Sequence, residues 1–157
     1  MTGMLPSLLV GLAAAAAGQA APLPSRPECV GRPGPIHINV VVEGLRSAQG
    51  LVAVTVYADD SSRFLARRGS LYVGRVPARS PTTRLCIYLP SAGVYALGVY
   101  HDANGDRRFD RTGIGLPAEA FGFSNNPGTM FGIPSFRSVR LAVPRSNMRT
   151  TVRIRYP

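Results

Sequence analysis

The sequence lacks lysine and tryptophan and has few acidic residues, cysteines and histidines. All 18 basic residues are arginine and stand against 8 acidic residues, which gives a net charge of +10. The arginines are scattered in runs no longer than two, whereas nucleic-acid binding needs basic side chains clustered on one face. Two histidines leave few candidates for a general base. The composition therefore argues against a nucleic-acid partner and gives little support to acid–base catalysis.

Long apolar segments are also missing. The longest apolar run, residues 8–17, is too short to span a bilayer, which takes about 20 residues. Small residues at Gly18 and Ala20 follow it, at the two positions that a signal peptidase reads. We predict a signal peptide over residues 1–20, a Pro-rich lead-in over 21–35, and a periplasmic or secreted protein that is not transmembrane after cleavage.

Cys29 and Cys86 are the two cysteines of the chain. An even number of cysteines in an exported chain is most simply a disulfide, here joining the lead-in to the middle of the fold. Two buried free thiols are the alternative, because free cysteine often behaves as a small core residue. A metal site is disfavoured, since neither His37 nor His101 has ligand spacing to a cysteine.

Short β-type runs alternate with turn signals from residue 36 onward, in a chain with 14 prolines and 17 glycines. Strands are predicted over residues 36–40, 51–57, 71–76, 83–89, 94–100, 138–143 and 150–156, the last two as a hairpin around 144–147. One short helix of one or two turns is predicted around Phe64, after the capping residues at 59–62 and before Gly69. The pattern predicts an all-β fold for residues 36–157, an immunoglobulin-like or transthyretin-like antiparallel β-sandwich of about seven strands with one short helix.

Residues 101–136 interrupt this pattern with a long stretch that has no helical or strand periodicity. Loops of this length inside a compact domain are usually functional or disordered. Disordered segments are poor in aromatic residues, but this stretch carries five phenylalanines, at Phe109, Phe121, Phe123, Phe131 and Phe136. We therefore predict an ordered, functional loop in which Phe121, Phe123 and Phe131 are at least partly buried.

The acidic start of this loop has a possible metal-binding pattern. Asp102, Asn104, Asp106 and Asp110 stand at relative positions one, three, five and nine, the spacing of oxygen ligands in a calcium-binding EF-hand loop. The sixth and twelfth positions depart from that motif. We hypothesise a calcium site and keep two alternatives: turns in which these side chains cap backbone amides, and ion pairs with the arginines at 107, 108 and 111.

Several segments together resemble the DUF2141 family of exported bacterial proteins over residues 36–156, among them GLRSAQG, VAVTVY, YHDANGDRRFD and AFGFSNN. The resemblance implies a periplasmic or secreted β-sandwich with no established activity. Its first signature is matched by Asp102, Asn104, Gly105, Asp106 and Asp110, and its second by Glu119, Gly122, Phe123, Ser124, Asn125 and Asn126. Together with His101 and Phe121, these residues form a candidate ligand-binding or structural loop.

Three classes of function are compatible with the sequence. We favour an exported, non-enzymatic binding or accessory module that presents loop 101–136 to an unknown envelope ligand or protein and is stabilised by calcium. The second is a hydrolase-type enzyme with His101 and the loop carboxylates as acid and base and Ser124 as nucleophile; Ser124 lacks the strand-turn-helix elbow of such enzymes. The third is an envelope protein that binds anionic lipid or polysaccharide through the arginines at 140, 149, 153 and 155.

Overall fold

A computed structural model describes residues 28–128 and 133–157. The predicted signal peptide, the start of the lead-in and Phe131 lie outside these residues. The described part contains eight strands and one short helix: β1 (Ile36–Glu43), β2 (Leu51–Ala58), β3 (Tyr72–Pro77), β4 (Thr82–Leu89), β5 (Gly93–Asp102), β6 (Phe121–Phe123), α1 (Phe136–Val139), β7 (Leu141–Val143) and β8 (Met148–Arg153). The predicted all-β class is confirmed.

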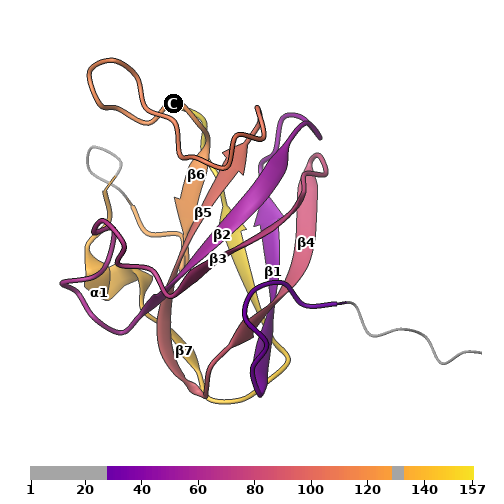
Figure 1. The fold of residues 1–157 in the computed structure, drawn as a ribbon, viewed down its shortest axis with the longest axis vertical. Coiled ribbons are helices and arrows are strands. Elements are labelled where there is room, and N and C mark those ends of the chain that lie inside the picture. The colour runs from indigo at the N-terminus through magenta and orange to yellow at the C-terminus, as the bar shows by residue number, and fades with distance from the viewer. Residues whose placement is uncertain (1–27, 129–132) are drawn as a thin grey trace, which may run out of the picture.

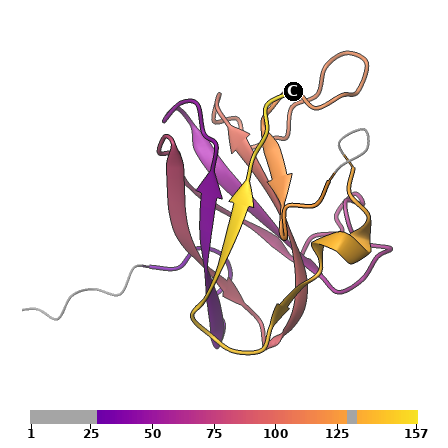
Figure 2. The same ribbon diagram turned by 180° about the vertical axis from the view of Figure 1, so that it is seen from behind.

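The strands form two sheets packed face to face (Figures 1 and 2). One sheet has the order β4-β1-β8, and the other has the order β3-β2-β5-β6, with β7 paired to the first residues of β5. Alternate residues of each strand point into the space between the sheets. Val40 and Ile87 from the first sheet and Val54 and Leu97 from the second belong to this core and are fully buried. The fold is therefore a sandwich with one main core.

The last two strands do not form the predicted hairpin. β7 joins β5 in the larger sheet, whereas β8 lies parallel to β1 in the smaller one, so residues 144–147 cross from one sheet to the other (Figure 2). Asn147 makes this crossing with a positive φ of 64° and accepts a hydrogen bond from Asn39 Nδ2 at 2.9 Å. Val143 and Val152 are both buried, in agreement with the alternation of apolar residues in these two runs. The alternation of apolar residues predicted which side chains are buried but not which strands are partners.

The short helix also lies elsewhere than predicted. Residues 61–68 form turns, because Leu65 and Arg68 adopt positive φ values of 57° and 59° that an α-helix does not allow. Asp60 does cap this segment, accepting a hydrogen bond from the Ser62 N–H at 2.9 Å. The helix instead forms at α1, and Phe64 packs against Phe136 with ring centroids 5.5 Å apart.

The lead-in is attached to the sandwich by a Cys29–Cys86 disulfide, which confirms the predicted pairing. Val30 adds a short parallel bridge to β4: its N–H donates to Cys86 O at 2.9 Å, and its carbonyl accepts from Tyr88 N at 3.1 Å. The Val30 side chain lies against β3, where a Cβ on Gly74 would come within 2.7 Å of it. The lead-in therefore spans the opening between the two sheets at their β4 and β3 edges.

The larger sheet is also apolar on its outer face. Tyr57, Ala96, Phe123 and Val139 form a second buried cluster there, separate from the main core. The turns after β2 and the helix α1 lie over this face (Figure 1). Within the described residues, no helix is both long and apolar enough to cross a membrane.

Candidate functional site: an aromatic pocket beneath an acidic loop

The predicted loop 101–136 is divided by regular structure. Residues 101 and 102 end β5, residues 121–123 form β6, and α1 begins at Phe136. Between β5 and β6, residues 103–120 form a folded excursion that we call the roof loop. Its two arms are joined by hydrogen bonds from Thr112 N to Leu116 O at 2.8 Å and from Ala118 N to Asp110 O at 2.9 Å. Within residues 101–128 and 133–136, which the structure describes, the segment is folded and includes the strand β6 and the start of α1.

The acidic residues at the start of the roof loop fold it into consecutive turns. Asn104 Oδ1 accepts from Asp106 N at 3.1 Å, and Asp106 Oδ1 accepts from Arg108 N at 2.8 Å. Gly105 and Arg107 both have positive φ values, 72° and 67°, and glycine allows this conformation at no steric cost. These contacts are the backbone-capping turns that the sequence left as one alternative.

Two further carboxylates hold the far arm of the loop. Asp110 Oδ2 accepts from Asn104 Nδ2 at 2.9 Å, and Glu119 Oε2 accepts from Asp110 N at 3.1 Å. Burial raises the pKa of the Glu119 carboxyl, and the nearby charges of Asp102, Asp110 and Asp106 raise it further. Burial and neighbouring negative charges both disfavour the ionised form of a carboxyl group relative to water.

Asp102 is the most buried of these acids, with no exposed surface. Its Oδ2 accepts from Arg107 N at 2.9 Å, while its Oδ1 has no partner among the described residues. An unpaired, buried carboxylate oxygen carries a large desolvation cost. The carboxylate faces the roof loop, because the Arg107 amide that it binds belongs to that loop.

The arginines of the loop do not neutralise these acids. Neither of the two ion pairs found among the described residues, Arg140–Asp59 and Arg153–Glu43, involves the roof loop. In the same residues, no group of three or more His, Cys, Asp or Glu side chains is placed to share a metal ion. Asp102, Asp106 and Glu119 instead accept from backbone amides of the loop. Asp110 accepts from the side chain of Asn104. These two ion pairs also engage two of the four arginines in the predicted basic face.

His101 and Ser124, the base and nucleophile of the enzyme hypothesis, both have structural partners. His101 Nε2 lies 2.8 Å from the Gln49 carbonyl, and Nδ1 lies 2.8 Å from the Tyr156 hydroxyl. Ser124 Oγ accepts from Leu97 N at 3.0 Å and donates to the Val139 carbonyl. Within the described part of the chain, no hydrogen bond joins the two side chains.

The asparagines of the second signature tie β6 to its neighbours. Asn125 Nδ2 donates to Arg140 O at 2.7 Å, and Asn126 Nδ2 donates to Thr151 O at 2.8 Å. Both asparagines have positive φ, which asparagine tolerates better than most residues. Gly122 lets β8 approach, because a Cβ there would lie 2.4 Å from Arg153 O. These residues therefore fix the position of β6, and Gly122 and Asn126 also line a second, smaller hollow of about 170 Å³ between β6 and the end of the chain.

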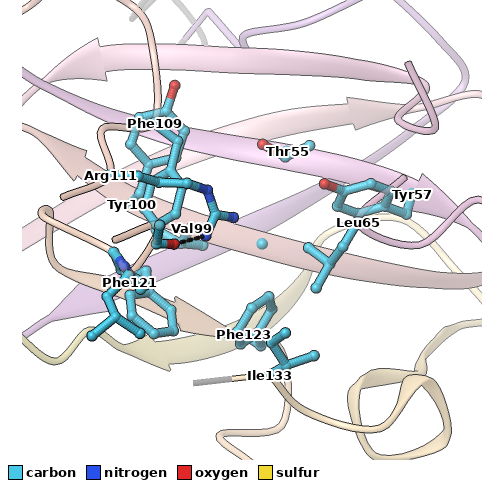
Figure 3. A pocket seen from close by; sticks show the side chains of 14 residues that line it. Thr55, Tyr57, Leu65, Val99, Tyr100, Phe109, Arg111, Phe121, Phe123 and Ile133 are labelled. Atoms are coloured by element: carbon cyan, nitrogen blue, oxygen red, sulfur yellow. Dashed lines mark hydrogen bonds between the residues drawn. The ribbon is translucent and has the colours of Figure 1, made fainter. Parts of the chain in front are cut away.

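A pocket of about 410 Å³ opens beside the roof loop on the outer face of the larger sheet (Figure 3). Its floor comes from β2 and β5, one wall from β6, and its cover from the roof loop. The described residues that line it are mostly apolar or aromatic: Thr55, Tyr57, Leu65, Gly98, Val99, Tyr100, Phe109, Arg111, Gly115, Leu116, Pro117, Phe121, Phe123 and Ile133. Small-molecule sites typically have volumes of roughly 300–1,000 Å³, so this pocket has the size of such a site.

Strand register explains why this face is hollow. Gly98 pairs with Thr55 on one side and Phe123 on the other, so a residue without a side chain stands at the centre of the floor. A Cβ on Gly98 would meet the Phe123 and Tyr57 rings at 3.6 Å, an ordinary contact distance. The space above Gly98 is thus part of the pocket and could hold a side chain.

Aromatic rings meet edge to face around this hollow. The ring centroids of Tyr100 and Phe109 are 5.3 Å apart, those of Phe109 and Phe121 are 5.9 Å apart, and those of Phe121 and Phe123 are 5.9 Å apart. Burial raises the pKa of the Tyr57 and Tyr100 phenols, so both rings remain neutral at physiological pH. The predicted burial is confirmed for Phe121, which is half-buried, and for Phe123, which is buried.

Sequence reasoning selected the roof loop but missed the floor of the pocket. Tyr57, Gly98 and Tyr100 were read only as strand residues, since they are far apart in the chain. A glycine inside an apolar strand was the available signal, because it often marks a place where something approaches the backbone closely. Only the pairing of β2, β5 and β6 brings these residues to one surface.

The structure therefore defines a disulfide-linked β-sandwich with an aromatic pocket on the outer face of its larger sheet. The chain belongs to the family described as "Uncharacterized protein conserved in bacteria (DUF2141)", whose sequence model matches residues 40–151. The resemblance seen in the sequence is thus confirmed. No curated protein and no solved structure gives a significant match.

Proposed function

We propose that this protein is an exported, non-enzymatic binding module and that the aromatic pocket is its ligand site. The observation that carries the proposal is the pocket itself: a hollow of about 410 Å³, walled by aromatic rings and lined by few polar groups. Concave, mostly apolar sites with a few convergent polar groups are the usual form of small-molecule sites. The partners found for His101 and Ser124 give the hydrolase alternative no support.

Export is supported by two independent features. The Cys29–Cys86 disulfide is a bond that persists in the bacterial periplasm or outside the cell and is rare in the cytosol. The N-terminal sequence predicts a leader that would direct the chain there. Mass spectrometry of the exported protein tests this part, because it should find an N-terminus near Ala21 and no free thiol.

Filling the pocket tests the binding site directly. Gly98→Leu places a side chain in the open space at the centre of the floor, and Gly98→Ala is the matched control that adds one methyl group at ordinary contact distance. The neutral fluorescent probe N-phenyl-1-naphthylamine suits the assay, because the chain has no tryptophan to interfere. We expect saturable binding to the parent protein, weakened about tenfold or more by Gly98→Leu, equivalent to about 1.4 kcal/mol, and little changed by Gly98→Ala.

A circular dichroism spectrum and a melting curve accompany each variant to show that the sandwich is intact. Probe binding that Gly98→Leu leaves unchanged in a folded protein would place the probe elsewhere and contradict the assignment of the pocket. Absence of saturable binding by the parent protein would contradict the proposal as a whole.

We further propose that the roof loop binds calcium, which would hold the cover of the pocket in place. The specific support is Asp102, whose fully buried Oδ1 has no partner in the described residues, next to the carboxyl of Glu119. Calcium takes six to eight oxygen ligands. Binding would require Asp106 and Asp110 to exchange contacts with loop atoms for contacts with the ion.

Melting curves in millimolar calcium and in chelator test this second proposal. Calcium at one hundred times its Kd should stabilise the fold by about 2.7 kcal/mol, and Asp106→Ala should abolish that gain. An unchanged melting temperature, with Asp106→Ala no worse than an ordinary surface substitution, would leave the backbone-capping turns as the whole role of these acids.

A further inference from the structure

We infer that the pocket selects an aromatic carboxylate: a flat aromatic body held between the rings, with its anionic group bound by Arg111. This inference rests on the proposed function and names the class of ligand. It follows from the position of Arg111, the nature of the pocket walls and the distribution of charge around them.

Arg111 brings its guanidinium over the floor of the pocket (Figure 3). Of the described lining residues, Arg111 alone carries a formal charge. One guanidinium nitrogen, Nη1, donates to Gly115 O at 2.9 Å, and the group lies 5.3 Å from the centre of the Phe109 ring. No carboxylate within the described residues forms an ion pair with it. The loop therefore holds the positive charge of Arg111 at the pocket. No carboxylate of the described residues is paired with the guanidinium.

A guanidinium presents several N–H donors in one plane, and this geometry matches the two oxygens of a carboxylate. The bond to Gly115 and the contact with Phe109 restrict the side chain before any ligand arrives. Less conformational entropy is then lost when an anion binds. Arg111 is thus positioned as the polar group that sets the orientation of a ligand.

The walls indicate the body of the ligand. Tyr100, Phe109, Phe121 and Phe123 follow one another with neighbouring rings close to perpendicular, at interplanar angles of 67°, 83° and 73°. Aromatic pairs favour such edge-to-face or offset arrangements. An aromatic ligand can continue this sequence of contacts over Gly98.

The surrounding charge also favours an anion. None of the described lining residues is acidic, and the chain carries a net charge of +10, which raises the local concentration of anions around the protein. The buried acids Asp102 and Glu119 face the roof loop and do not line the pocket. Their charges do act on the Tyr100 hydroxyl at the pocket wall, where they are opposed by Arg75, whose Nη2 lies 3.4 Å from that hydroxyl. An anionic aromatic ligand therefore meets the charge of Arg111 in a pocket that no carboxylate lines.

Competition against N-phenyl-1-naphthylamine tests this inference with two nearly isosteric ligands, 2-naphthoate and 2-naphthamide, at pH 7. The Arg111→Gln variant removes the charge and keeps an amide donor for the Gly115 carbonyl. Arg108→Gln is the matched control, because it removes the same charge from an exposed residue of the same loop outside the pocket lining.

We expect the parent protein to bind 2-naphthoate about tenfold or more tightly than 2-naphthamide, as a charge-assisted hydrogen bond implies. Arg111→Gln should remove this preference, so that the affinities of that variant for 2-naphthoate and 2-naphthamide lie within about twofold of each other. Arg108→Gln should retain the preference.

Equal affinities of the parent protein for 2-naphthoate and 2-naphthamide would overturn the inference and leave the apolar binding site standing, provided that both displace the probe. A preference that Arg111→Gln and Arg108→Gln reduce equally would also overturn it, because general surface charge would then be the cause. If no ligand or probe binds, the proposed function itself has failed.

Discussion

Removing the disulfide should destabilise the protein substantially, because the bond closes a long segment of chain. Cys29 and Cys86 are separated by 57 residues in sequence. Cys86 is buried in β4, and Cys29 precedes the residue that bridges β4. Replacing both cysteines with serine removes the covalent link and leaves the hydrogen bonds of Val30 available to form.

The chain-entropy relation gives the expected size of the effect. For a closed loop of this length, cross-linking removes about 14 cal/mol/K from the entropy of the unfolded chain, or about 4 kcal/mol at 25 °C. A domain of about 120 residues unfolds with an entropy of about 0.25 kcal/mol/K. The double variant should therefore melt about 15 °C below the parent protein.

Thermal melts followed by circular dichroism measure this difference, and treatment of the parent protein with a reductant should reproduce it. Val30→Ala is the control that weakens packing of the lead-in while keeping the disulfide. We expect that variant to cost about 1 kcal/mol. A shift below about 3 °C for the double cysteine variant, under 1 kcal/mol by the same conversion, would refute the reasoning, because it would mean that the cross-link does not restrict the unfolded chain.

Two further predictions concern the roof loop and β6. The raised pKa of the Glu119 carboxyl means that its charged form opposes folding. This loss of stability is absent at a pH well below the ordinary pKa of 4.5. It is fully developed once the pH exceeds the pKa of the folded state. Glu119→Gln should thus raise the melting temperature at neutral pH in chelator, with a gain that disappears in acid; a loss at neutral pH would refute it. Gly122→Ala should cost about 1–3 kcal/mol because β8 lies so close, whereas Gly113→Ala, where a Cβ meets no described atom within 4 Å, should be nearly neutral; equal melting temperatures would contradict this.

The sequence alone was sufficient to predict the β-sandwich and most of its buried residues. Alternation of apolar and polar residues has a period of two in a strand, so the inward positions of β1 and β4 could be read directly. The near-continuous apolar runs of β2 and β5 are typical of strands covered on both faces. The outer aromatic cluster and the main core together provide that cover. The disulfide also followed from the sequence, since the chain offers a single pair of cysteines.

Strand partners and the ligand site were decided by tertiary structure. A buried valine satisfies either sheet equally, so Val143 and Val152 could not show that β7 and β8 belong to different sheets. The pocket depends on the register that places Gly98 between Thr55 and Phe123, and residues so distant in sequence carry no mutual signal. The acidic spacing indicated oxygen atoms gathered in one loop. Whether those atoms cap amides or meet at one point depends on backbone dihedrals such as the positive φ of Arg107, which composition does not determine.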